Sequence, residues 1–298
     1  MARSSQKRTE RGAAAMLLGP FMVLFVATLV VPIGYAVYLS LFTERSSGLG
    51  FGGTETLFAG LGNYLHALSD PAFRDGFWVI VGYLVGYVPV MVGGALLLAL
   101  LLDSTLARAK RFFQLTLYLP HAVPGLIAAI IWLYLYTPGL SPVVSAMRDS
   151  GLSWNFLSSD HALSSVVNIA VWEWIGYNVV IFYAALQAIP REVIEAASVD
   201  GAGELRTALS IKLPMIRAAV VMTVMFTIIG ALQLFTEPVI LNGANPAVSA
   251  TWTPNMYAYD AAFRKSDYGL AAAASILLAL AAAALSFVVT RVSQRRTA

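Results

Sequence analysis

Six apolar segments, each long enough to cross a bilayer, dominate the sequence. A helix needs roughly 20 mostly apolar residues to span the hydrocarbon core of a membrane. The segments cover residues 13–42, 77–102, 114–136, 163–188, 215–241 and 268–290. Pro120 and Pro124 interrupt the third segment, and prolines are tolerated in spans where neighbouring helices satisfy the freed backbone groups. The sequence therefore predicts an all-α polytopic membrane protein with six transmembrane helices.

The composition excludes several other classes of protein. Charged residues make up only 12% of the 298-residue chain and hydrophobic residues 58%, which fits neither a soluble globule nor a disordered chain. A net charge of +3 is too small for a nucleic-acid-binding surface. Because the chain has no cysteine, disulfide frameworks and thiol catalysis are also excluded. The three histidines lie far apart, so we expect no metal site.

The first apolar segment follows a basic tail, residues 1–12, and such a pair also occurs in signal peptides. The apolar run here is nearly 30 residues long, which exceeds the apolar part of a signal peptide, and no small-x-small cleavage site follows it. We therefore expect residues 13–42 to remain as a transmembrane helix.

The distribution of basic residues predicts the orientation. With the N-terminus inside, 14 of the 19 Lys and Arg residues fall in inner segments and 5 fall in outer loops. Positive residues collect on the cytoplasmic side of membrane proteins. We expect both termini, including a second basic tail at residues 291–298, to be cytoplasmic, as an even number of spans requires.

One connection differs from the others. The outer loops at residues 43–76, 137–162 and 242–267 are expected to be mainly solvated connections. The inner segment 189–214 is too long and too rich in helix-forming residues for a simple turn. Ala196, Ala197 and Val199 could form a short apolar strip there, and Gly201 permits a sharp bend. This segment predicts a helix–glycine–helix element on the cytoplasmic face, able to fit a groove on another protein.

The same segment resembles the signature of permease subunits of binding-protein-dependent ABC importers. That signature is Glu-Ala-Ala, three residues, Gly, nine residues and Ile-x-Leu-Pro, and every spacing is kept. The matching positions are Glu195, Ala196, Ala197, Asp200, Gly201, Ile211, Leu213 and Pro214.

Further stretches are similar to the carbohydrate and glycerol-phosphate uptake branch of these permeases, the maltose-type pore subunits. They are Gly60–Tyr64 with Asp70–Phe73, Leu186–Pro190, Ala261–Phe263 and Tyr268–Ala273. The resemblance implies the type I ABC importer permease fold. Residues 77–290 would form its core domain after the first helix, with residues 189–214 as its coupling loop.

The resemblance also implies a set of partners in the plasma (inner) membrane. Two permease subunits, here a heterodimer, would form the pore, two ATP-binding subunits would drive it, and an extracytoplasmic solute-binding protein would deliver the solute. The chain has no Gly-rich phosphate loop, so ATP and Mg²⁺ would bind the ATPase subunits and no cofactor would bind this chain. The eight signature residues would couple ATP hydrolysis to transport, with Glu195 bonding a basic ATPase residue.

A substrate site is predicted around Glu173, which the sequence indicates as the only charge deep in a span. Neighbouring aromatic and polar side chains suit a sugar, although an aromatic belt at the membrane surface explains them equally well. The resemblance places substrate contacts at Glu173, Trp174, Tyr177, Thr227, Gly230 and Ala231, with Gln233 close by. No Lys or Arg lies in the interior of a span, which favours a neutral sugar over a polyol phosphate.

Two other classes of membrane protein remain as alternatives. A secondary transporter driven by an ion gradient would usually show inverted repeats and broken-helix ion sites, and no repeat is visible. An intramembrane enzyme would need paired catalytic groups at one depth, and no such pair stands out.

Overall fold

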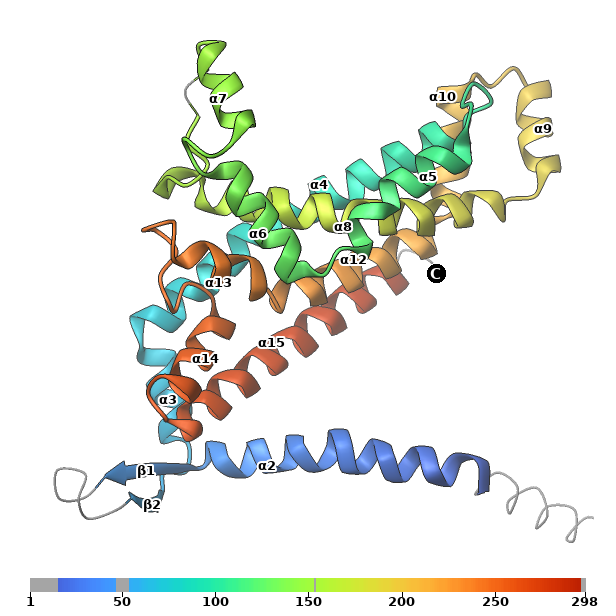
Figure 1. The fold of residues 1–298 in the computed structure, drawn as a ribbon. Coiled ribbons are helices and arrows are strands. Elements are labelled where there is room, and N and C mark those ends of the chain that lie inside the picture. The colour runs from blue at the N-terminus through green and yellow to red at the C-terminus, as the bar shows by residue number, and fades with distance from the viewer. Residues whose placement is uncertain (1–15, 47–53, 153, 296–298) are drawn as a thin grey trace, which may run out of the picture. The chain divides into compact units, whose positions relative to one another are not determined.

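A computed structural model describes residues 16–46, 54–152 and 154–295 of the chain (Figure 1). The described chain divides into two compact units. One unit draws on residues up to Asp70 and on Ala258–Leu277, and the other comprises Pro71–Tyr257 and the residues from Leu278 onward. The predicted tail 1–12 lies outside the described residues, as do the last three residues of the tail 291–298.

The first span is one continuous helix, Met16–Ser40. It contains a π-helical turn, η1 (Val26–Val30), followed by α2 (Val31–Ser40). Nothing in its most apolar stretch is buried within the described chain, as expected of a helix that faces lipid or another subunit.

The segment after the first span has more secondary structure than the sequence predicted. Antiparallel strands β1 (Phe42–Ser46) and β2 (Thr54–Phe58) pair with Phe42 opposite Phe58, and α3 (Gly62–Ser69) follows. Asn63 Nδ2 donates hydrogen bonds to the carbonyl oxygens of Ser40 (2.9 Å) and Phe42 (2.8 Å), which fixes α3 against the end of α2. The described residues of segment 43–76 therefore form strands and a helix and not a simple connection.

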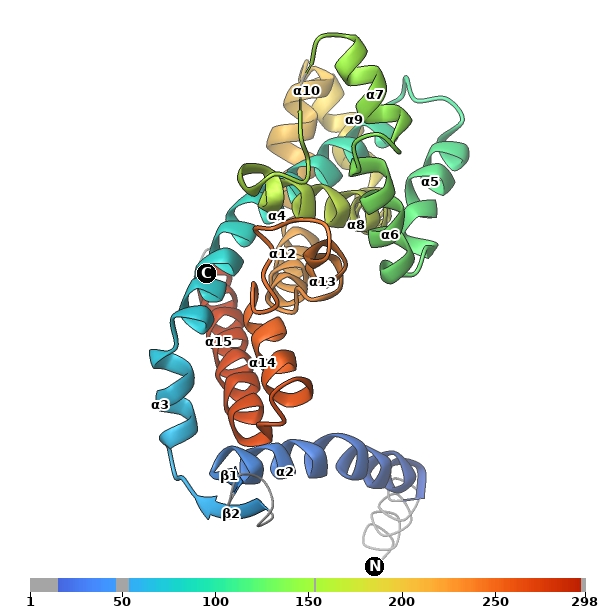
Figure 2. The same cartoon turned by 60° about the vertical axis from the view of Figure 1, so that its left-hand side comes forward.

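The second unit is built on three long helices. These are α4 (Pro71–Asp103), α8 (Ala162–Gln187) and α12 (Arg217–Leu232). α4 and α8 lie side by side in both views (Figures 1 and 2). Small residues between the two helices let their backbones approach closely. A Cβ on Gly94 would stand only 3.0 Å from Ile175 Cδ1, and Ala95 packs in the same buried cluster as Val179.

The third span is a bent pair of helices. α5 (Lys110–Tyr118) and the short turn η3 (Leu119–Ala122) meet α6 (Gly125–Tyr136) at 96° (Figure 1). Pro124 is the N-cap of α6, so the predicted interruption becomes a sharp turn within the span. α5 lies so close to α8 that a Cβ on Gly176 of α8 would overlap the carbonyl of Leu117 of α5.

The fifth span also breaks before its end. α12 stops at Leu232 and α13 (Thr236–Asn242) continues the span, so residues 233–235 form a non-helical link. The remaining helices are short or follow this break. They are α7 (Pro142–Asp149), η4 (Ser159–His161), α9 (Arg191–Val199), α10 (Glu204–Thr207), η5 (Ala208–Lys212), α11 (Leu213–Met215), α14 (Pro254–Phe263) and α15 (Tyr268–Arg295).

Five helical spans of the described chain are long and apolar enough to cross a membrane, and the bent pair makes a sixth if it counts as one span, which agrees with the six predicted spans. The predicted bounds are wrong at some ends. The second helix begins at Pro71 and not at residue 77, and the third begins at Lys110 and not at residue 114. These ends extend into polar sequence, where hydropathy loses its signal although the helix continues.

Candidate substrate cavity and coupling element

A cavity of about 520 Å³ lies within the second unit. Its walls come from α4, α8, α12 and α13, with one residue of α6. All seven residues that the sequence assigned to a substrate site line it: Glu173, Trp174, Tyr177, Thr227, Gly230, Ala231 and Gln233. The structure thus brings two separate stretches of sequence to one site.

The cavity combines aromatic faces with hydrogen-bonding groups. Tyr83 and Tyr87 of α4 stack with ring centroids 4.9 Å apart, and both line the wall. Thr223 of α12 is only 2% exposed, and its Oγ1 has no hydrogen-bond partner among the described residues. A buried hydroxyl without a partner indicates a missing ligand group or water.

Glu173 lies at the bend of the third span. Its side chain is 7% exposed, and a Cβ placed on Gly125 would stand 3.2 Å from Glu173 Oε1. Gly125 is the first residue of α6, so the carboxylate lies beside the positive end of that helix dipole. The absence of a side chain at Gly125 makes this approach possible.

The prediction that Glu173 is the only charge deep in a span is wrong. Glu237 lies in the first turn of α13, within the fifth span, and lines the same cavity. Its position follows from the helix break at residues 233–235, which turns the start of α13 into the cavity wall. Glu237 directly follows Thr236 and lies four residues after Gln233, and these three polar residues in an apolar segment were the available signal.

His121, at the other side of the bend, joins the aromatic residues of α8. Its ring centroid lies 4.6 Å from that of Trp174 and 4.8 Å from that of Tyr177. Its Nδ1 is buried and has no hydrogen-bond partner among the described residues. These contacts hold the two aromatic side chains at the cavity.

The segment 189–214 forms the predicted helix–glycine–helix element. α9 ends in a Schellman motif, in which the Ala202 N–H bonds the Ala197 carbonyl (2.9 Å) and the Gly201 N–H bonds the Ser198 carbonyl (3.1 Å). Gly201 has φ +76°, a backbone conformation that residues other than glycine rarely adopt. The glycine of the signature is therefore required by the backbone turn between α9 and α10.

Most of the signature faces outward. Glu195, Ala196, Asp200, Gly201 and Pro214 are exposed, Ile211 and Leu213 are half-buried, and Ala197 is buried. The apolar strip predicted from Ala196, Ala197 and Val199 is wrong, because Val199 is 87% exposed whereas Ala197 is 6% exposed. Apolar side chains do reach solvent on this element, and they are Val199, Leu205 and Leu209.

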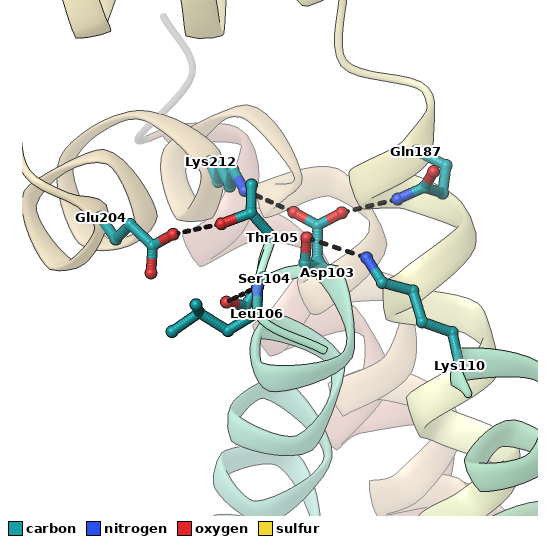
Figure 3. Close-up of polar contacts among 8 residues, drawn as sticks. All are labelled: Asp103, Ser104, Thr105, Leu106, Lys110, Gln187, Glu204 and Lys212. Carbon is teal, nitrogen blue, oxygen red and sulfur yellow. Dashed lines mark hydrogen bonds and ion pairs between the residues drawn. The ribbon is translucent and has the colours of Figure 1, made fainter. Parts of the chain in front are cut away.

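A polar cluster around Asp103, at the end of α4, fixes both ends of the element (Figure 3). Asp103 Oδ1 accepts a hydrogen bond from Gln187 Nε2 (2.6 Å), and its Oδ2 pairs with Lys212 Nζ (2.5 Å). Thr105 Oγ1 donates to Glu204 Oε1 of α10 (2.7 Å). The sequence did not reveal this cluster, because its members are far apart along the chain.

Residues 94–298, about two thirds of the chain, match the family described as the binding-protein-dependent transport system inner membrane component. The chain belongs to this family. As a member of this family, the chain is a permease subunit of an ABC importer and an inner membrane component. Its long apolar helices agree with a place in the membrane.

Curated relatives agree with the assignment. The chain is 33% identical to the sn-glycerol-3-phosphate transport system permease protein UgpA of Salmonella typhimurium over 267 residues, 88% of each chain. It is 31% identical to the protein of that name from Yersinia pseudotuberculosis over 284 residues, 94% of each chain.

Two solved structures share the fold of this permease subunit. One is a bacterial ABC transporter involved in the import of the acidic polysaccharide alginate, with a TM-score of 0.84, 20% identity and full coverage of both chains. The other is a bacterial alginate ABC transporter in complex with a periplasmic protein bound to an alginate pentasaccharide, with a TM-score of 0.79 and 19% identity over 98% of this chain and 97% of that chain. The fold is thus the type I ABC permease fold.

Proposed function

We propose that this permease subunit forms half of the pore of an ATP-driven importer for a sugar or a related polyol phosphate. The observation that carries the proposal is the pairing of two sites in one chain. One is a membrane-embedded cavity with aromatic and hydrogen-bonding walls, and the other is an exposed element with the family's coupling signature.

The coupling element would dock in a cleft of an ATP-binding subunit. Val199, Leu205 and Leu209 are exposed and apolar, which suits burial against a partner. Glu195 is exposed and available for a charge-assisted hydrogen bond to a basic residue of the ATPase. Movement of the docked element would reach the spans through Asp103 and Lys212, which join it to the end of α4.

Alternating access would then follow from rocking of the spans around the cavity. The bend at Pro124 and the break at residues 233–235 both border the cavity.

The assembly would contain two permease subunits, two ATP-binding subunits and an extracytoplasmic solute-binding protein. A sister permease, rather than a second copy, would complete the pore. ATP and Mg²⁺ would be held by the ATP-binding subunits and no cofactor by this chain. Both termini would be cytoplasmic, because 14 of 19 basic residues then lie on the inner side.

Copurification tests the proposal. The tagged chain, expressed with the genes that flank its own, should retain an ATP-binding subunit in mild detergent. In liposomes, uptake by that complex should require ATP and the binding protein and should persist when ionophores dissipate ion gradients. Uptake that ionophores abolish and ATP does not drive would favour the ion-gradient transporter instead.

A further inference from the structure

The charges of the cavity restrict which solutes it can accept. We propose, on the basis of the function proposed above, that this cavity accepts uncharged polyhydroxylated solutes and rejects solutes that carry a phosphate or carboxylate group.

The cavity wall carries two carboxyl groups and no basic side chain to compensate them. Glu173 and Glu237 are the charged side chains among its described lining residues, and no Lys, Arg or His is included. No hydrogen bond or ion pair joins either carboxylate to another side chain in the described part of the chain. Inside a membrane the repulsion of an anionic solute is stronger than in water, because the surroundings screen it less.

The feature that could attract an anion already has a carboxyl group of the protein beside it. The N-terminus of α6 lies at the bend of the third span, and helix N-termini often bind anions. Glu173 Oε1 lies beside this helix end, 3.2 Å from where a Cβ of Gly125 would stand. A phosphate or carboxylate of a solute would have to displace the protein's own carboxylate.

The other groups suit hydroxyls. Thr223 Oγ1 is buried without a partner, and Gln233 on the wall offers both a donor and an acceptor. Carboxylate oxygens accept hydrogen bonds from sugar hydroxyls, and the rings of Trp174 and Tyr177 can pack on the C–H faces of a sugar. An uncharged polyol can use all of these groups at once.

This substrate class differs from those named for the related proteins. The curated relatives are named for sn-glycerol 3-phosphate, and the solved structures concern an acidic polysaccharide. Both solutes are anions. The two carboxyl groups therefore predict a selectivity for this chain that differs from the solutes named for those proteins.

The absence of cysteine from the sequence permits a direct measurement of the charge in the cavity. Thr227→Cys introduces the single thiol of this chain into the wall, within a full complex whose other subunits are made cysteine-free. Its reaction rates are measured with cationic trimethylammonioethyl and anionic sulfonatoethyl methanethiosulfonate in detergent. Leu140→Cys, at a side chain that is 63% exposed in the loop before α7, is the control.

We expect the ratio of cationic to anionic rates to be at least about tenfold higher for Thr227→Cys than for Leu140→Cys. Adding Glu237→Gln should lower the ratio, and adding Glu173→Gln as well should bring it close to the control value. Glu237→Gln alone suffices if the triple variant does not assemble. A ratio at or below that of the control, or one that Glu237→Gln leaves unchanged, would overturn the proposal.

Uptake by the unmodified complex in liposomes provides the second arm. ATP-dependent uptake of glycerol 3-phosphate or of an alginate oligosaccharide would overturn the charge selectivity, whereas uptake of a neutral sugar alone would support it. Stimulation of ATP hydrolysis by the binding protein reports the importer function separately. A complex that shows this stimulation but prefers the anionic reagent would refute the selectivity and leave the proposed function intact.

Discussion

Lys212 Nζ lies 2.5 Å from Asp103 Oδ2, and this ion pair joins two positions that are 109 residues apart in the sequence. Asp103 ends α4, and Lys212 ends the π-helical turn η5 that leads from the coupling element into the fifth span. Both side chains are largely buried, at 11% and 19% exposed. The ion pair therefore joins the coupling element to the end of α4 in the transmembrane core, and we call this contact the joint.

The first prediction concerns this joint. Asp103→Asn and Lys212→Met should each lower the thermal stability of the complex and the number of solutes imported per ATP. Each single variant removes one charge-assisted hydrogen bond, worth about 1.5–3 kcal/mol, and leaves a partner without its ion pair. Calorimetry of the purified complex measures its thermal stability, and uptake assays measure the number of solutes imported per ATP.

The double variant Asp103→Asn/Lys212→Met supplies the control for this prediction. Because no uncompensated charge remains in the double variant, its loss of stability should be smaller than the sum of the losses of the two single variants by about 1 kcal/mol or more. Purely additive losses would show that the two residues act independently.

The second prediction concerns packing of α5 against α8. Gly176→Ala should destabilise the protein by at least about 1–3 kcal/mol, because its Cβ would overlap the backbone carbonyl of Leu117. Gly93→Ala, in α4, is the matched control, since a Cβ there meets nothing within 4 Å. Thermal unfolding of the two variants in detergent compares them, and equal melting temperatures would contradict the packing.

The third prediction concerns the aromatic wall of the cavity. Trp174→Ala should raise the solute concentration needed for half-maximal uptake about five- to tenfold, because loss of a stacking aromatic face costs about 1–1.5 kcal/mol. Trp78→Ala changes the same residue type at a side chain that is 69% exposed in α4 and does not line the cavity, so uptake should be unchanged. Similar uptake defects in both variants would indicate a general loss of structure.

Much of the fold is visible in the sequence because a membrane imposes strong local rules. Six apolar runs predict six spans, and Pro120 and Pro124 predict the interruption of the third. Gly201 predicts the turn in the coupling element, since the Schellman motif there requires a positive φ. These features depend on neighbours in the sequence, and so a sequence pattern can reveal them.

Other features depend on contacts between distant residues. No proline or glycine marks residues 233–235, so the helix break that brings Glu237 into the cavity was missed. Strands β1 and β2 were expected to be part of a connection, because two five-residue strands carry little hydrophobic pattern. The joint between Asp103 and Lys212 is visible only once α4 and η5 are placed side by side.

The most direct test of the account is the coupling of ATP hydrolysis to transport in Gly201→Asp, compared with Gly203→Asp. Both residues have open space around them, but Gly201 has φ +76°, whereas Gly203 has φ −65° and is the N-cap of α10, where aspartate is favourable. The two variants thus add the same charge, and Gly201→Asp also strains the turn that orients α9 and α10.

In liposomes containing the full complex, we expect Gly201→Asp to insert and assemble normally but to lose most of its uptake per ATP hydrolysed. Gly203→Asp should keep uptake near the unmodified level. Normal uptake by Gly201→Asp, with hydrolysis still stimulated by the binding protein, would contradict the assignment of residues 189–214 as the coupling element.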